Sequence, residues 1–336
     1  MMARPRSPGP PVRPPPSPTL ALALAVGGCA EPVAITHTLA LRGTWSRVEV
    51  GDNGGDLHLQ SPDGDITRRR SFDGTLLERF DPLPTAGEWL HDVTEEAGTA
   101  RVLASGAAEF FDWTGTTVAE PLLADGRATG ILGARSTERG VAVLRDDADE
   151  GCLVDWLFSD DLDTVPLPAE ACATPACVVA DRPVNRLLIS TGGATWSVSP
   201  TEATTWESPG ALCAFDASSG TLAVGETGSR LVRAFGSDGE ERWAVELPNP
   251  VRGLGDLGAG SAIAATSVTP DGAGELLLLD AGTGDPTLAL ETPRPGTAVV
   301  GGGQGRVLAL LLATELHVFS VDLPEAPSTT ADSGGR

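Results

Sequence analysis

Four histidines are the side chains of this 336-residue chain best suited to ligate a metal or to transfer protons near neutral pH. They are His37, His58, His91 and His317, dispersed over separate predicted strands without the short spacing of metal-binding pairs. The sequence contains no Gly-x-Ser-x-Gly turn and no phosphate-binding glycine loop. It therefore predicts no catalytic residues, no metal site and no cofactor.

One acidic segment, Asp147-Ala148-Asp149-Glu150-Gly151, resembles the start of a calcium-binding loop. Such a loop needs a carboxylate at its twelfth position. Counted from Asp147, that position is Phe158. We therefore interpret the segment as an acidic hairpin turn.

Overall charge excludes some classes of partner. The formal net charge is −23, and neutralising phosphates requires clustered positive charge. The one basic cluster, Arg68-Arg69-Arg70, is short, and strand alternation would divide it between two faces. We expect no nucleic-acid partner.

Residues 1–28 have the features of an export signal: arginines without acidic residues, then a short apolar run from Leu20 to Val26. The run is too short to span a bilayer. It ends at Val26-Gly27-Gly28-Cys29, which resembles a bacterial lipobox. The resemblance implies lipidation of Cys29, and Ala30 after it implies an outer-membrane lipoprotein, facing the periplasm or the cell surface. The alternative is an ordinary secretory signal in which Cys29 is incidental.

Beyond this signal, short apolar runs and turns rich in Gly and Asp recur with a period of about 42 residues. The first strands of these units centre near residues 47, 91, 131, 178, 213, 253 and 299. About four short strands in each unit of 40 to 45 residues is typical of a β-propeller blade. Two segments, Phe235–Trp243 and Leu279–Asp285, resemble repeats of the PQQ-like and WD40-like propeller families.

The last unit ends at Val321 without an outer strand, whereas an apolar segment, Val33 to Leu41, precedes the first unit. We therefore predict an all-β fold: a seven-bladed β-propeller over residues 29–323, its ring closed by the N-terminal strand, followed by a disordered tail over residues 324–336.

Three arginines, Arg127, Arg252 and Arg294, lie just before or at the start of predicted inner strands. These positions rim one mouth of a propeller channel. The arginines there could bind an anionic ligand or carboxylates of a partner. The alternative is ordinary solvated loop charge.

Four further cysteines, an even number in an exported chain, predict two disulfides, and three pairings are open. Cys177 and Cys213 occupy matching places in neighbouring inner strands, while Cys152 and Cys172 lie toward one face of the preceding unit. Because a disulfide needs Cα atoms within about 7 Å, the predicted blades favour Cys152–Cys172 with Cys177–Cys213.

These features predict a monomeric, lipid-anchored interaction platform at the cell envelope that binds a protein partner or a ligand. The competing hypothesis is a propeller enzyme, a hydrolase or lyase that uses carboxylates and a metal at the channel mouth. Converging carboxylates near the channel would favour the enzyme, and an apolar or aromatic surface patch would favour the binding protein.

Overall fold

Glycine and aspartate turns divide the chain into short strands. Between Leu212–Asp216 and Thr221–Gly225, for example, a carboxylate oxygen of Asp216 accepts a hydrogen bond from the amide of Ser219 at 2.8 Å. Gly220 then takes a positive φ of 61°, which glycine adopts at little cost. Nearly all side chains of both strands are buried. Apolar runs separated by such turns can only be buried by stacking sheets on one another.

The structure is a computed structural model, and it describes residues 34–51, 55–63, 65–80, 88–91, 99–102, 108–111, 117–122, 131–137, 140–158, 162–174, 176–257, 262–302 and 307–322. The predicted lipidation site Cys29 and the segments 1–28 and 324–336 lie outside these residues. In the described part of the chain, no helix has the length and apolar character needed to cross a membrane.

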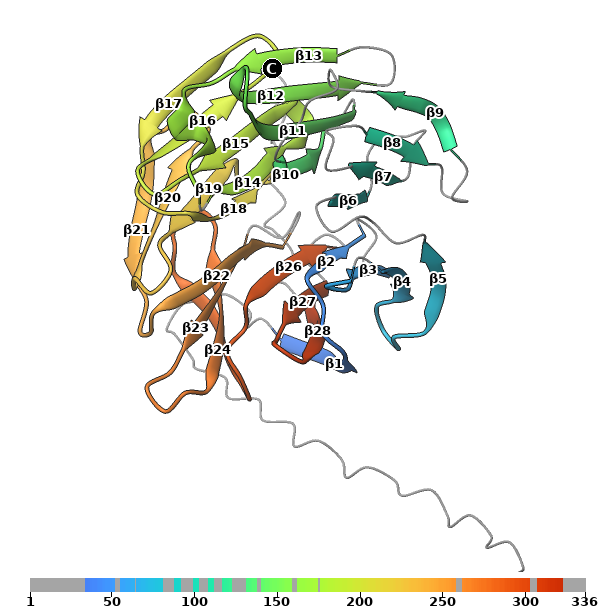
Figure 1. The fold of residues 1–336 in the computed structure, drawn as a ribbon. Helices are drawn as coiled ribbons and strands as arrows, with labels where there is room; N and C mark the ends of the chain where they lie inside the picture. The colour runs from blue at the N-terminus through green and yellow to red at the C-terminus, as the bar shows by residue number, and fades with distance from the viewer. Residues whose placement is uncertain are drawn as a thin grey trace, which may run out of the picture.

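The described strands form seven four-stranded antiparallel sheets (Figure 1). The first four sheets are β2–β5 (Arg47–Val50, Asp56–Gln60, Ile66–Arg70, Leu76–Phe80), β6–β9 (Glu88–His91, Thr99–Val102, Ala108–Phe111, Thr117–Leu122), β10–β13 (Ile131–Ser136, Gly140–Asp147, Gly151–Phe158, Leu162–Pro166) and β14–β17 (Cys177–Asp181, Arg186–Ser190, Ala194–Val198, Ala203–Glu207). The next two are β18–β21 (Leu212–Asp216, Thr221–Gly225, Leu231–Gly236, Glu241–Glu246) and β22–β25 (Val251–Asp256, Ala262–Val268, Gly274–Asp280, Pro286–Thr292). The last combines β26–β28 (Ala298–Gly302, Val307–Leu311, Glu315–Asp322) with β1 (Ala34–Arg42). Two short 3₁₀ helices, η1 (Ala169–Cys172) and η2 (Arg182–Val184), complete the described elements.

The sheets are arranged around a central axis, and the first strand of each sheet lies nearest to it (Figure 1). Neighbouring inner strands pack against one another from β6 through β10, β14, β18, β22 and β26 to β2. Apolar clusters fill the space between consecutive sheets. One of them joins Ala264, Leu276 and Leu278 of one sheet to Leu308 and Leu310 of the next.

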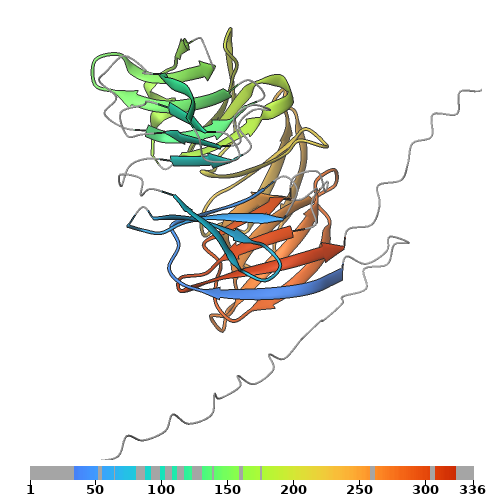
Figure 2. The same cartoon turned by 90° about the vertical axis from the view of Figure 1, so that its right-hand side faces the viewer.

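The N-terminal strand β1 is the outer strand of the last sheet. It pairs antiparallel with β28, from Ala34 opposite Asp322 to Arg42 opposite Glu315 (Figure 2). A Cβ atom added at Gly74, in the turn between β4 and β5, would collide with the side chain of Leu41. The side chain of Leu41 in this N-terminal strand therefore packs against the turn between β4 and β5.

The structure corrects the prediction of a seven-bladed β-propeller whose ring is closed by the N-terminal strand. Six blades have a packed side-chain core, and in the β6–β9 sheet the buried core residues that the structure describes are Ala100 and Val102. Three strands of this sheet have only four residues, so each can turn no more than two side chains toward a neighbouring sheet. The inner-strand packing from β6 to β2 makes six junctions. A closed ring would need a seventh junction, between β2 and β6. Strand β1 completes the last sheet and does not supply that junction, so ring closure by β1 is not confirmed.

Two tryptophans of outer strands pack on glycine turns of the following blade. A Cβ atom at Gly239 would lie 2.8 Å from the Trp206 ring, and one at Gly284 would lie 2.7 Å from the Trp243 ring. The indole nitrogen of Trp243 also donates a hydrogen bond to the carbonyl oxygen of Ala281 at 2.9 Å. Both glycines belong to the segments that resemble propeller repeats. Their lack of a side chain is what allows the ring and the turn to meet.

Candidate functional site

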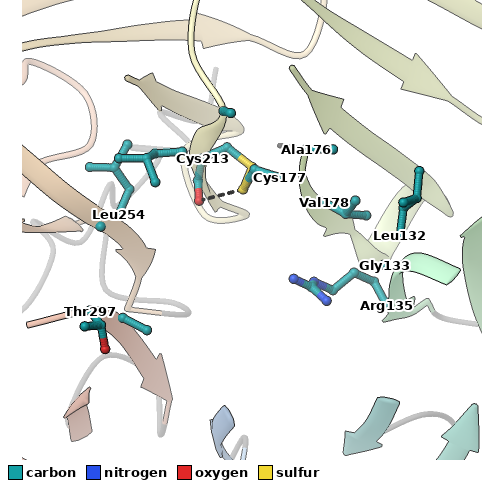
Figure 3. Close-up of a pocket in the computed structure, with 13 residues that line it drawn as sticks. Leu132, Gly133, Arg135, Ala176, Cys177, Val178, Cys213, Leu254 and Thr297 are labelled. Atoms are coloured by element: carbon teal, nitrogen blue, oxygen red, sulfur yellow. Dashed lines mark hydrogen bonds between the residues drawn. A yellow bond between two sulfur atoms is a disulfide. The ribbon is translucent and has the colours of Figure 1, made fainter. Parts of the chain in front are cut away.

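Five inner strands line an open cavity of about 250 Å³ near the central axis (Figure 3). Its walls come from β10, β14, β18, β22 and β26 and from the residues just before three of these strands. Most lining groups are small or apolar side chains. The lining residues are Leu132, Gly133, Arg135, Ala176, Cys177, Val178, Ala211, Leu212, Cys213, Gly253, Leu254, Thr297 and Ala298.

Arg135 is the charged side chain of this lining. Figure 3 shows it extending from β10 into the cavity. Its Nη1 donates a hydrogen bond to the carbonyl oxygen of Ala134 at 2.6 Å, which holds the guanidinium near the wall. A guanidinium in apolar surroundings favours a carboxylate or another planar anion. Among the described residues that line it, there is no carboxylate and no histidine that could accept a proton.

Two disulfides brace this part of the propeller. Cys177 of β14 and Cys213 of β18 are joined across the channel wall, with their Cα atoms 5.7 Å apart. Cys152 of β12 and Cys172 of η1 are joined with Cα atoms 5.6 Å apart. These are the two pairs that the sequence favoured. The first links neighbouring blades at the cavity itself, and the second fixes the loop that connects one blade to the next.

Two of the three arginines predicted at the channel mouth belong to the described residues, so the predicted anion or partner site stays a prediction. Arg127 lies outside the described part of the chain. Arg252 is exposed, and the cavity is lined by the two residues that follow it in β22. Arg294 is also exposed, and its Nη1 donates to the hydroxyl of Thr314 at 3.0 Å.

Sequence reasoning missed Arg135. The alternation of side chains along β10 could have indicated it, because Gly133 and Arg135 are two residues apart and both line the cavity. The register shift between Ile131 and Gly133 changes which side chains face the axis, and nothing in the sequence marks it.

The histidines whose side chains are described lie in different sheets. His58 of β3 is buried, with its ring edge-on to Phe80 at a centroid distance of 6.0 Å. His317 of β28 lies 3.6 Å from Glu315. His37 and His91 have described backbone but no described side chains. Across the described stretches, no three His, Cys, Asp or Glu side chains are placed to hold a metal ion.

The acidic segment at Asp147 forms the turn between β11 and β12. One carboxylate oxygen of Asp147 accepts hydrogen bonds from the amides of Asp149 and Glu150 at 2.8 and 3.0 Å. The other oxygen lies 2.8 Å from Nη1 of Arg145, whose Nε lies 2.5 Å from Asp155. The amides of Glu150 and Asp149, with Arg145, lower the pKa of Asp147. A buried guanidinium thus occupies the place between the carboxylates that a calcium ion would need.

Comparisons with known proteins agree with this geometry. No family model matches the chain, and no curated protein matches it. Among solved structures, the β-propeller domain of Myceliophteria thermophila Cps50 (Swd1) aligns with a TM-score of 0.62 at 14% identity, over 87% of this chain and 100% of that one. A chain of the Mitotic Checkpoint Complex aligns with a TM-score of 0.60 at 12% identity, over 90% and 98%.

This chain has a WD40-like β-propeller fold. At such identities the likeness concerns the fold alone. The PQQ-like type suggested by the two glycine-rich segments stays a prediction.

Proposed function

We propose that this propeller is a monomeric protein-interaction scaffold of the cell envelope, exported and anchored through a lipid on Cys29. The observation that supports binding is the composition of the axial cavity. In the described part of its walls, Arg135 is the one cation among small apolar groups, and no carboxylate stands there to transfer a proton. Such a surface can recognise an anionic or apolar group, but its lining supplies no general acid or base.

The structural neighbours support the same proposal. One of them is a chain of a protein complex, the Mitotic Checkpoint Complex. A propeller offers a broad, rigid surface, and here one disulfide joins two neighbouring blades while the other fixes a loop between blades. Rigidity favours binding because little conformational freedom is lost when a partner docks.

The location is supported by chemistry rather than by similarity. Disulfides persist in oxidising compartments outside the cytosol. The arginine-bearing, apolar segment that ends at Cys29 supplies the route of export. Lipid chains attached there would hold the propeller at a membrane, with about 0.8 kcal/mol for each buried methylene group.

Crosslinking in intact cells tests the function. We expect wild-type chain to be crosslinked to one or a few envelope proteins and to fractionate with membranes. The Cys29→Ala variant should keep the fold but should no longer be found in the membrane fraction. Recovery of the chain without any crosslinked protein would refute the scaffold, and a wild-type chain in the soluble periplasmic fraction would refute the anchor.

A further inference from the structure

Exposed apolar side chains gather on one hairpin of the β2–β5 sheet. Across the described residues, five large apolar side chains are exposed by more than a third: Phe72 (57%), Leu76 (38%), Leu77 (41%), Val184 (54%) and Leu231 (38%). Three of these five lie within six residues, in the turn after β4 and at the start of β5. Single exposed apolar residues are ordinary, whereas a cluster marks a surface that binds something.

The same hairpin carries positive charge on a strongly acidic chain. Arg70 lies over the Phe72 ring, 5.1 Å from its centroid, and 3.4 Å from a carboxylate oxygen of Asp73. Arg79 of β5 is exposed, and no ion pair to it is found in the described part of the chain. Leu77 and Arg79 are both exposed, whereas Glu78 between them is partly buried.

Other arginines of the hairpin are engaged within the blade. Arg68 is paired with Asp56 at 2.6 Å and lies 3.8 Å from Glu78. Arg69 donates a hydrogen bond to the carbonyl of Gly74 at 3.0 Å. Arg79 is therefore the cation of this surface that is most available to an outside carboxylate.

The hairpin presents these groups in a fixed arrangement. The amide of Gly74 donates to the carbonyl of Arg70 at 2.9 Å, and the amide of Thr75 donates to Asp73 at 2.9 Å. Gly74 has a φ of +70° and packs under Leu41 of β1. Little conformational freedom remains to be lost when a ligand binds here.

Among the described strands, β5 has a pairing partner on one side only. It is the last strand of its sheet, in the order β2-β3-β4-β5. Its residues pair with β4 from Ile66 opposite Phe80 to Arg69 opposite Leu76, and a bulge leaves Leu77 without an opposite residue. A bulge of this kind redirects a side chain outward. Beyond it, the edge from Glu78 to Phe80 can still accept an extended chain.

We propose that this hairpin docks an extended acidic segment of a protein partner. Apolar side chains of that segment would cover Phe72, Leu76 and Leu77, and its carboxylates would pair with Arg79 and Arg70. The inference rests on the proposed scaffold function and names the chemistry of the partner. A protein segment fits better than an anionic membrane because it can place its carboxylates beside Arg79 and Arg70 and away from Asp73 and Glu78, whereas a continuous layer of negative headgroups cannot avoid these two carboxylates.

Fluorescence anisotropy with the full-length chain tests the proposal. The probe is a labelled eight-residue peptide that alternates glutamate and leucine, and the comparison peptide alternates lysine and leucine. We expect the acidic peptide to bind more tightly, and its affinity to fall with added salt. Leu77→Ser and Arg79→Glu should each weaken its binding about tenfold. Leu231→Ser, an equally exposed leucine elsewhere, should leave binding unchanged.

Equal affinity for both peptides, or equal binding by the two hairpin variants and wild type, would overturn the proposal. Flotation with vesicles of phosphatidylglycerol and phosphatidylcholine that is lost in the hairpin variants would overturn it in favour of a membrane contact. Crosslinking in cells separates the two claims. A partner that is still captured by the hairpin variants refutes this docking site while the scaffold stands, and capture of no protein by wild type refutes the scaffold.

Discussion

Removal of the disulfides tests how this propeller is held together. We consider two variants, Cys152→Ala with Cys172→Ala, and Cys177→Ala with Cys213→Ala. The bridges close segments with sequence separations of 20 and 36 residues. In the chain-entropy description, loops of these lengths stabilise the fold by about 3.3 and about 3.8 kcal/mol.

The two losses should therefore be similar, although the bridges have different structural roles. One ties a connecting loop to β12, and the other ties two inner strands across the cavity. Each variant should lose about 3–4 kcal/mol in its free energy of unfolding, measured by urea denaturation and tryptophan fluorescence without reductant.

Wild-type protein treated with a reductant under unfolding conditions is the matched control. It should lose about as much stability as the two bridges together, and non-reducing peptide mapping should recover only the two expected linked pairs. Wild-type stability that is unchanged by reductant, together with four titratable thiols, would refute both the bridges and the oxidising compartment.

Three further predictions concern packing and charge. Gly284→Ala should destabilise the fold by about 2–4 kcal/mol because Gly284 is at positive φ and the added Cβ would meet Trp243. Gly220→Ala, at positive φ but in open space, should cost about 1–2 kcal/mol. Equal losses of stability in thermal denaturation would contradict the packing of Trp243 on Gly284. Arg145→Met should cost about 3–5 kcal/mol because buried aspartates lose their counterion, and a neutral effect would show that they are not ionised. Since the pKa of Asp147 is lowered in the folded state, its contribution to stability is present above the unfolded pKa of about 3.9 and is lost as pH falls through the folded value. Asp147→Asn should therefore reduce the dependence of the free energy of unfolding on pH in acid. An unchanged slope of the free energy of unfolding against pH would refute this role of Asp147.

The repeat was readable from the sequence where strands are buried. Inner strands such as β18 are apolar runs followed by an aspartate or glycine turn, and their positions follow the predicted spacing. Outer strands were harder to see because their side chains are largely exposed: β17, Ala203–Glu207, carries only Trp206 as a large apolar residue. Their existence follows from backbone pairing, which composition does not reveal.

The candidate sites were less predictable for a different reason. Which side chain faces the axis depends on the register of pairing, and one bulge in β10 alters it near Arg135. Partners from separate strands, such as Arg145 and Asp155, are ten residues apart and meet only because β11 and β12 pair. The cysteines were more tractable, since a disulfide tolerates a narrow range of Cα separations and each predicted blade fixes where its strands lie.

Binding of a protein partner by this propeller can be measured by native mass spectrometry of the chain, extracted from its own membranes in mild detergent. We expect a species heavier than one chain that contains a second, different protein in a fixed ratio and that dissociates at high salt. A mass that corresponds to the single chain alone, at every detergent and salt concentration that preserves the fold, would contradict it.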